Sequence, residues 1–368
     1  MSELVLVTGG AGFIGRRVGD ELLRRGHRVR VLDSLVEQVH GDTTRPDDLD
    51  SEIELIRGDV RDRAAVDRAL RDVDSVLHLA AEVGVGQSMY AVERYTSAND
   101  VGTAVLFEGL IERPVRRVVV ASSMSLYGEG MYRTVDGRLV EDAVKPATGE
   151  NGWDPMDEQG RPLEPVPTPE TKRPGLNSVY ALNKYVQERL TLTLAPAYGM
   201  EWSALRLWNA YGPGQALGNP YTGVLAIFSS RLLAGQPPVI FEDGMQQRDF
   251  VHVRDVARAF CDALEKPEAN GGIFNIGSGQ TRTVREVASA IGKAMGREIA
   301  PEVTGQSRTG DTRHCVPDMT LAREKFGFEA REDWMAGLQE LAEWVGRQTA
   351  NDNVAQARAE LEKRGLVA

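Results

Sequence analysis

The chain begins with a short apolar strand that runs directly into a glycine-rich turn. Residues 4–7 are LVLV, and residues 9–15 are GGAGFIG, with Gly9, Gly12 and Gly15 spaced three apart. Apolar positions at helical spacing follow over residues 13–25. A strand, a tight glycine turn and a new helix form the phosphate-binding turn of α/β folds, where free N–H groups face a pyrophosphate. The turn therefore predicts a parallel sheet with a nucleotide at its edge.

The first half of the chain continues the alternation of strands and helices that begins at this turn. Apolar runs predict further strands, and amphipathic stretches between them predict helices, the longest over residues 90–111. Strands that alternate with helices indicate βαβ units and hence a Rossmann-type, doubly wound α/β fold. The strands expected here are 29–32, 53–56, 73–79, 118–120 and 201–207, with a shorter helix over 64–70.

Residues 128–177 interrupt this alternation of strands and helices. Residues 128–177 hold seven prolines and few apolar clusters, so we expect an irregular insertion without regular elements. Such a loop is either a lid over a binding site or a surface excursion, and both interpretations stay open here. The later apolar stretches are shorter and mixed, and they predict a smaller α/β lobe that closes with a helix over 334–345.

Asp33 closes the second predicted strand, eighteen residues beyond Gly15. A carboxylate there bonds the ribose hydroxyls of a dinucleotide and repels a 2′-phosphate, which favours NAD over NADP. Asp59, after the third strand, lies on the same edge of the sheet and is placed to reach the adenine. Taken singly, Asp33 is also typical of a strand-end turn and Asp59 of a solvated one; the glycine turn is what favours the dinucleotide.

A candidate catalytic group comes from two further places. Tyr180 and Lys184 are four residues apart in a predicted helix, so they share a face, and an ammonium beside the phenol would lower the pKa of the tyrosine. A tyrosine made acidic in this way can accept the proton of an alcohol. Ser122 and Ser123 follow the 118–121 strand at the edge where α/β folds bind ligands. Each feature alone is common on protein surfaces.

The combined motifs are more specific than any one of them. GGAGFIG, HLAA at 78–81, ASSMSLYG at 121–128, YALNK at 180–184, LRLWNAYGPG at 205–214, RDFVHV at 248–253 and FNIGSG at 274–279 occur in this order. In this combination the chain resembles the extended short-chain dehydrogenases/reductases, in particular the nucleotide-sugar epimerase/dehydratase group, over residues 3–345. The resemblance implies a Rossmann domain, a smaller C-terminal lobe for the nucleotide-sugar, tightly held NAD and a catalytic Ser/Tyr/Lys triad.

The resemblance also assigns residues to sites. The triad is Ser123, Tyr180 and Lys184, and Ser123 is preferred to Ser122 because it lies four residues before Tyr127 of the family's motif. Cofactor contacts, besides Tyr180 and Lys184, are implied for Gly9, Gly12, Phe13, Ile14, Gly15, Asp33, Asp59, Val60, Leu79, Ala80, Ala81 and Asn99. Substrate contacts are implied for Val83, Ser123, Ser125, Tyr180, Asn209, Val224, Val239, Phe241, Arg248 and Arg308.

The arginines suit phosphate because a planar guanidinium meets it in two hydrogen bonds. Taken singly, Arg248 and Arg308 are also ordinary surface residues, and Phe241 is equally typical of a core. In domain terms we expect an NAD-binding domain over 1–200, with a catalytic helix at 178–198, a mainly nucleotide-sugar-binding lobe over 201–350 and a polar tail over 351–368.

Ser125 distinguishes among the family's reactions. Dehydratases and decarboxylases of the family usually carry an acid at this position and 3,5-epimerising relatives a cysteine, so a serine favours oxidation and re-reduction at one carbon, as in a 4-epimerase. Galactose-type epimerases usually have lysine where this chain has Val83. That valine, with VGQSMY at 85–90, resembles dTDP-L-rhamnose 4-epimerases, with UDP-glucose/galactose next. The alternatives are a nucleotide-sugar dehydrogenase or reductase with net NAD(H) turnover and, less favoured, a non-enzymatic NAD-sensing regulator.

The net charge and the cysteine content limit the kinds of ligand and partner that the chain is expected to bind. A net charge of -11 disfavours binding to nucleic acid or to an anionic membrane surface, though not to a small anionic ligand. Two cysteines, 54 residues apart, predict neither disulfides nor a metal site. The start of the chain lacks a secretory pattern and no run of 18 apolar residues occurs, so we expect a cytoplasmic protein. The resemblance adds a homodimer that pairs the 90–111 and 178–195 helices, burying Leu190 and Leu194.

Overall fold

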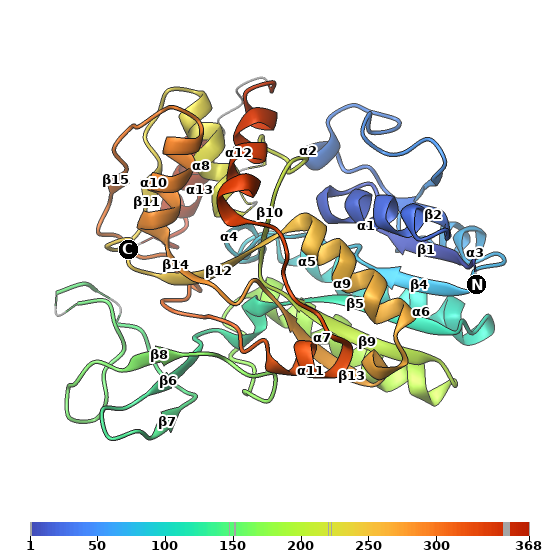
Figure 1. Cartoon of the computed structure of the whole chain (residues 1–368), viewed down its shortest axis with the longest axis horizontal. Helices are drawn as coiled ribbons and strands as arrows, with labels where there is room; N and C mark the ends of the chain where they lie inside the picture. Colours follow the sequence, from blue (N-terminus) through green and yellow to red (C-terminus); the bar gives the residue numbers. More distant parts are fainter. Residues whose placement is uncertain are drawn as a thin grey trace.

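The computed structural model describes residues 2–146, 148–150, 152–219, 221, 223–348 and 354–367. Its centre is a seven-stranded parallel sheet in the order β13-β9-β5-β4-β1-β2-β3 (Figure 1). The strand order reverses between β1 and β4, which is the place where α/β sheets bind ligands beyond the carboxyl ends of their strands. The strands are β1 (Leu4–Thr8), β2 (Arg28–Asp33), β3 (Glu54–Arg57), β4 (Ser75–His78), β5 (Arg117–Ser123), β9 (Glu201–Leu207) and β13 (Gly272–Ile276).

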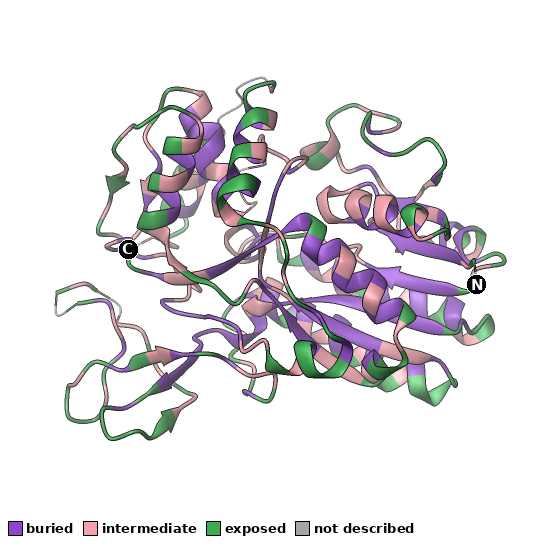
Figure 2. Cartoon of the chain, viewed as in Figure 1, coloured by how far each residue is buried: buried purple, intermediate pink, exposed green. Residues whose placement is uncertain are grey.

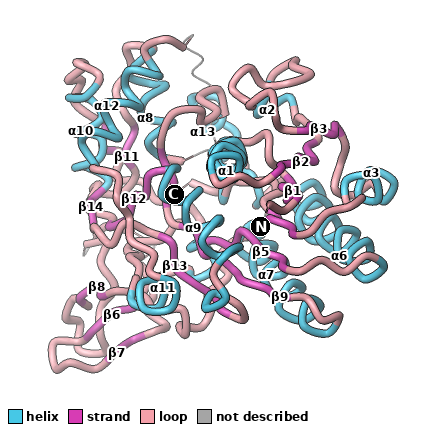
Figure 3. Tube along the Cα trace, turned by 45° about the vertical axis from the view of Figure 1, so that its right-hand side comes forward, coloured by secondary structure: helices cyan, strands magenta, loops and turns pink. Residues whose placement is uncertain are grey.

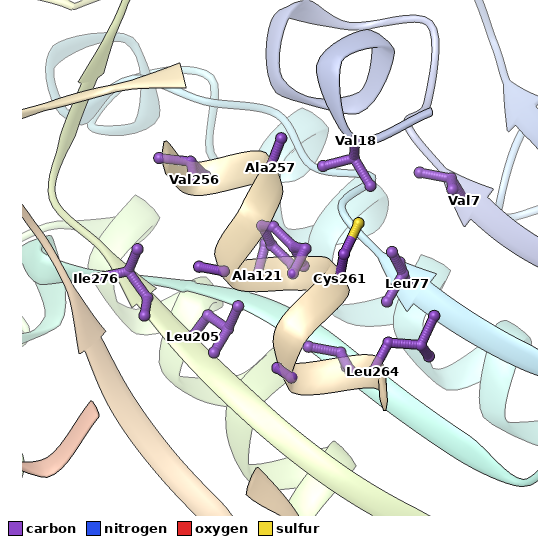
Figure 4. Close-up of a cluster of buried hydrophobic side chains, with 14 of the residues drawn as sticks. Val7, Val18, Leu77, Ala121, Leu205, Val256, Ala257, Cys261, Leu264 and Ile276 are labelled. Atoms are coloured by element: carbon purple, nitrogen blue, oxygen red, sulfur yellow. The ribbon is translucent and has the colours of Figure 1, made fainter. Parts of the chain in front are cut away.

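Helices cover both faces of this sheet, which confirms the doubly wound α/β prediction. Alternate residues of each strand point to opposite faces, so Val5 and Val7 join one apolar cluster and Leu6 joins another. In the first cluster, Cys261 and Leu264 pack with residues of the sheet (Figure 4). One face carries α1 (Phe13–Arg24), α9 (Val253–Glu265) and α11 (Thr320–Phe326); the other carries α3 (Arg63–Ala69), α6 (Gly102–Glu112) and α7 (Val179–Ala197).

The predicted long helix over 90–111 is present in two pieces. α5 (Val92–Thr96) continues through one turn of π-helix, Ser97–Val101, into α6. Two single-turn helices, α2 (Glu37–His40) and α4 (Val85–Ser88), lie in the connections after β2 and β4. A 3₁₀ turn, Met124–Tyr127, follows β5 directly, and another, Pro267–Ala269, follows α9. None of the helices in the described part of the chain is both long and apolar enough to cross a membrane.

A second lobe is built beside the carboxyl ends of the sheet. Its helices pack around Phe228, Ile240, Phe250 and Leu341, and β11 pairs with β15 at its edge. Its elements are α8 (Val224–Leu233), α10 (Val284–Ala294), α12 (Trp334–Val345) and the strands β10 (Asn209–Tyr211), β11 (Val239–Ile240), β12 (Gln247–His252), β14 (Thr281–Thr283) and β15 (Glu302–Val303).

The predicted domain boundary at residue 200 cuts through the central sheet. β9 and β13 both come from beyond that residue, and α9 packs against α1. After β9 the chain enters the second lobe through β10, returns for α9 and β13, and leaves again. The two parts are therefore interleaved in sequence, and the lobe is not a continuous segment.

The proline-rich insertion is more regular than its sequence indicates. Residues 131–166 contribute a three-stranded antiparallel sheet, with β6 between β7 and β8. This small sheet stands at one edge of the molecule in both views (Figure 1, Figure 3), with mostly exposed loops (Figure 2) and with Met131, Tyr132 and Val166 buried. The expectation of a segment without regular elements is wrong. β6 and β7 form a local hairpin that sequence reasoning missed, whereas β8 pairs with β6 from about thirty residues away, which leaves no local signal. The strands are β6 (Met131–Arg133), β7 (Leu139–Val140) and β8 (Glu164–Val166).

Candidate active site

The glycine turn closes tightly against the end of β4. Gly9 has φ +68°, and a Cβ there would lie 2.8 Å from backbone atoms of Ala80. A Cβ at Gly15 would lie 2.5 Å from the Cα of Gly10, so only glycine lets α1 start this close to the turn. α1 begins after Gly12, whose missing side chain leaves the first-turn N–H groups uncapped by any side chain. This cradle fits a pyrophosphate on a helix N-terminus.

Asp33 lies at the end of β2, beside this turn. Its carboxylate accepts hydrogen bonds from the backbone N–H groups of Ala11 at 3.0 Å and Leu35 at 2.8 Å. Asp33 thus fixes the glycine turn while also facing the cleft. Asp59 also faces the cleft, where hydrogen bonds from the Arg61 guanidinium hold its pKa below the usual value. Both carboxylates lie on the sheet edge that the sequence predicts for the dinucleotide.

A single cleft of about 1420 Å³ joins the glycine turn to the second lobe. It is lined by every residue that the sequence assigns to a site except Asn99: Gly9, Gly12, Phe13, Ile14, Gly15, Asp33, Asp59, Val60, Leu79, Ala80, Ala81, Val83, Ser123, Ser125, Tyr180, Lys184, Asn209, Val224, Val239, Phe241, Arg248 and Arg308. Residues up to about 300 positions apart in the sequence therefore line one cleft, which lies where the strand order reverses between β1 and β4.

Asn99 lies just behind the residues that line the cleft. Its side chain accepts a hydrogen bond from Glu82 N at 2.7 Å and donates one to Glu82 O at 3.1 Å. The residue is fully buried and sits in the π-helical turn. In this arrangement it fixes the backbone between Ala81 and Val83, both of which line the cleft. A direct contact of Asn99 with the cofactor stays a prediction.

Ser123 and Tyr180 come together at the carboxyl end of β5. Ser123 is the last residue of the strand, and its hydroxyl accepts hydrogen bonds from the N–H of Ser125 at 3.1 Å and its Oγ at 2.9 Å. Tyr180 lies in the first turn of α7, where its N–H donates to Ser88 Oγ at 3.0 Å. Burial raises the pKa of Tyr180 to about 12, and the neighbouring Ser123 hydroxyl opposes this rise only in part.

Lys184 lies one turn further along α7, and its environment differs from the sequence expectation. Its Nζ donates to Gln187 Oε1 at 2.6 Å. Burial lowers the pKa of Lys184 to about 7, although Glu188 and Asp100 favour its cation. The pKa of Tyr180 therefore lies above its usual value and not, as the sequence predicts, below it, because desolvation of the phenolate outweighs its neighbours.

Gln187 links this lysine to the cofactor side of the cleft, and sequence reasoning missed it. Its Nε2 donates to Ala80 O at 3.2 Å and to Thr103 Oγ1 at 2.9 Å. It also lies against His78, whose pKa burial lowers to about 3, so that this histidine is neutral. A glutamine three residues after a lysine on a helix carries no recognisable signal, because its partners come from β4 and α6.

The residues predicted for the substrate line the other half of the cleft. Asn209 Nδ2 donates to Asp249 O at 2.8 Å. Arg248 donates to the carbonyls of Thr312 and Arg313. Arg308 pairs with Asp311 at 2.8 Å, and its guanidinium carbon lies 4.6 Å from the centre of the Phe241 ring. Stacking against Phe241 holds the Arg308 side chain along this wall.

The structure places the proline-rich insertion away from the cleft. None of the described residues in 128–177 lines it, so the structure gives no support to the interpretation of this segment as a lid over the sugar. The insertion instead contacts the outer side of the second lobe, where Lys145 pairs with Glu242 at 2.6 Å and Asp154 pairs with Arg313 at 2.7 Å. Residues of the C-terminal segment, which the sequence suggests to be a tail, line the cleft in its place.

Comparison with known proteins agrees with this geometry. Residues 5–277 match the model of the NAD dependent epimerase/dehydratase family. The dTDP-L-rhamnose 4-epimerase of Burkholderia thailandensis is 35% identical over 357 residues, which cover 95% of this chain and 96% of that protein. The UDP-glucose 4-epimerase of Mycolicibacterium smegmatis is 33% identical, with coverage of 92% and 97%.

Solved structures are similar over the same length. The UDP-glucose 4-epimerase of Thermotoga maritima, solved with UDP-glucose, gives a TM-score of 0.76 at 32% identity over 93% of this chain and 98% of that one. The Thermus thermophilus UDP-glucose 4-epimerase, in complex with NAD, gives 0.73 at 31% identity over 94% and 100%. The chain therefore belongs to the NAD dependent epimerase/dehydratase family, and NAD is its cofactor.

Proposed function

We propose that this enzyme is a 4-epimerase of a nucleotide-diphosphate sugar, with dTDP-L-rhamnose or a similar 6-deoxyhexose as the favoured substrate and UDP-glucose/galactose next. The observation that carries the proposal is the position of Ser123, Tyr180 and Lys184 in the cleft that joins the glycine turn to Arg248 and Arg308. A sugar held by its diphosphate on those arginines reaches both the tyrosine and the cofactor.

The chemistry divides between cofactor and protein. When bound, NAD would supply a hydride acceptor for C4 and, once reduced, a hydride donor to the same carbon. Tyr180 accepts the proton of the 4-hydroxyl as that carbon becomes a ketone, and Ser123 donates a hydrogen bond to the same oxygen. Lys184, as a cation, stabilises the tyrosinate. When the 4-keto sugar turns over, Tyr180 returns its proton as the opposite face of C4 is reduced, so no external reductant is consumed.

Two residues support a 4-epimerase acting on a deoxy sugar. Ser125 stands where dehydratases and decarboxylases of the family usually carry an acid. Its hydroxyl donates a hydrogen bond to Ser123 Oγ at 2.9 Å. Val83 lines the cleft with 52% of its surface exposed, and an apolar side chain there suits the methyl group of a 6-deoxy sugar. The relative with 35% identity is itself named as a dTDP-L-rhamnose 4-epimerase.

A substrate panel tests the proposal. The purified chain is incubated with dTDP-L-rhamnose, UDP-glucose and UDP-galactose, and products are followed by proton NMR while NADH is followed by absorbance. We expect a new C4 epimer without net NADH, and the fastest turnover with the rhamnose derivative. Stoichiometric NADH would favour the dehydrogenase alternative, and preference for UDP-glucose would overturn the choice of sugar.

The Tyr180→Phe variant is the catalytic control. Loss of the proton acceptor should lower turnover by roughly 10²–10⁴-fold while NAD binding is kept. Tyr185→Phe, on the same helix but outside the cleft, should retain activity. The triad assignment is wrong if Tyr180→Phe keeps more than about a tenth of wild-type turnover, since a general acid–base group contributes far more than that.

A further inference from the structure

The C-terminal segment of the chain lies against the active-site cleft. α13 (Val354–Lys363) is followed by residues 364–367, and Ala357, Arg358, Leu361 and Leu366 all line the cleft. Ala357 and Leu361 are buried, with 7% and 6% of their surface exposed. One face of this polar helix is therefore covered by the rest of the protein, as an appended tail would not be.

On one side the segment is joined to the wall that carries Arg308. Leu366 O accepts a hydrogen bond from Thr309 N at 3.0 Å, and Val367 forms an antiparallel bridge with Arg308 itself. Arg358 donates to Gln306 Oε1 at 2.8 Å. Residues 306–309 are thus held from outside by backbone and side-chain contacts to the C-terminal segment.

On the other side the segment meets the connection after β4, which carries Val83. A Cβ at Gly86 would lie 3.5 Å from the methyl groups of Leu361, so Leu361 packs on the bare backbone there. The guanidinium carbon of Arg364 lies 4.5 Å from the centre of the Tyr90 ring. Tyr90 in turn hydrogen-bonds Tyr221, another residue that lines the cleft, at 2.5 Å.

We propose that residues 354–367 form a wall of the nucleotide-sugar half of the cleft, and that Leu361 and Arg358 strengthen binding of the nucleoside diphosphate by fixing the Arg308 stretch against the connection after β4. The inference rests on the proposed nucleotide-sugar substrate. The glycine turn and Asp33 have no contact with this segment among the hydrogen bonds and ion pairs of the described residues, so we expect the segment to affect binding of NAD much less than binding of the nucleoside diphosphate.

Truncation after Gln348 tests this directly. Binding of UDP, dTDP and NAD to the full chain and to the truncated chain is measured by titration calorimetry, with circular dichroism as the check on folding. We expect the dissociation constants for UDP or dTDP to rise by about tenfold or more, which corresponds to about 1.4 kcal/mol, while the constant for NAD stays within about twofold of the full chain's.

Point variants distinguish the specific contribution of the Leu361 contact from a general effect of removing the segment. Leu361→Asp should reproduce most of the loss, because it places a charge in the buried contact with Gly86. Lys363→Asp introduces the same residue at an exposed position of the same helix and should bind as the wild type does.

The outcomes distinguish this inference from the proposed function. If the truncated chain binds UDP and dTDP as tightly as the full chain, the inference that residues 354–367 strengthen nucleotide binding is wrong, and the proposed substrate class stands. If truncation weakens NAD equally, the segment supports the whole fold and the inference is also wrong. If the full chain binds neither UDP nor dTDP, the proposed substrate class fails and the inference fails with it.

Discussion

At the scale of single residues, burial disfavours the charged forms of both Tyr180 and Lys184. Burial raises the pKa of Tyr180 and lowers that of Lys184, in both cases because a charge is poorly solvated in the interior. The lysine is retained near its cation by Gln187, Glu188 and Asp100, while buried His78 stays neutral. Polar partners around Lys184 therefore set how far the site is charged near neutral pH.

Replacing Gln187 should shift the pH dependence of the reaction. In Gln187→Met the lysine loses the acceptor at 2.6 Å, so its cation becomes less stable and its pKa falls further below about 7. Since the cation supports the tyrosinate, the alkaline limb of kcat/KM should move to lower pH. Gln187→Glu should move it to higher pH. Unchanged pH profiles in both variants, with only a lower Tm, would leave Gln187 a purely structural residue.

Asp33 should make NAD the preferred cofactor. Its carboxylate faces the cleft and would repel a phosphate on the 2′-oxygen of the ribose. Calorimetric titration should show tighter binding of NAD than of NADP, and Asp33→Asn should narrow the difference while keeping an acceptor for Ala11 N. Equal or tighter binding of NADP by the wild type would contradict the assignment.

At the scale of elements, the proline-rich insertion is an anchor on the second lobe. Its Asp154 and Lys145 pair with Arg313 and Glu242, two side chains that are almost fully buried in the protein. Removing one partner from a buried charged pair leaves the other poorly solvated, which costs stability. The insertion thus contributes to the free energy of unfolding through charges that lie outside the catalytic cleft.

Shortening this insertion should separate stability from catalysis. Replacement of residues 144–169 by a short Gly/Ser linker should lower the Tm, because buried Glu242 and Arg313 lose partners worth about 1–3 kcal/mol. KM and kcat should change little at temperatures where the variant is folded, and no NADH should accumulate. A raised KM together with stranded NADH would restore the lid interpretation.

The elements also show how far sequence alone reaches. The glycine turn, Asp33 and the Tyr180–Lys184 spacing are local patterns, and the structure brings all of them to one cleft. Sequence reasoning misplaced features that depend on distant partners: the small sheet of the insertion pairs Tyr132 with Pro165, and α13 reaches the cleft through contacts with 302–309. Such pairings are absent from any local window.

At the scale of the whole molecule, we predict a homodimer through α6 and α7. Leu190 and Leu194, which the sequence assigns to this interface, are half-buried, and Leu194 also packs against the core. Leu182 on α7 and Val101, directly before α6, are large exposed apolar residues, with 46% and 50% of their surface accessible. Leu182→Asp should lower the molecular mass measured by light scattering toward that of a monomer.

A matched surface change serves as the control for this dimer. Met335→Asp introduces the same residue at a similarly exposed apolar position on α12, away from α6 and α7. It should leave the mass unchanged. A wild-type protein that is already monomeric at micromolar concentration would refute the dimer.

The interleaving of the central sheet has a consequence for how the chain matures during synthesis. α1 emerges from the ribosome long before the helix that packs on it, because α9 lies about 240 residues later, and β13 completes the sheet only at residue 276. At about 5–20 residues per second, that interval lasts roughly ten seconds to a minute. Until then the nascent chain displays the apolar face of its first helix and an unfinished sheet edge, which are the surfaces that chaperones recognise and that favour aggregation.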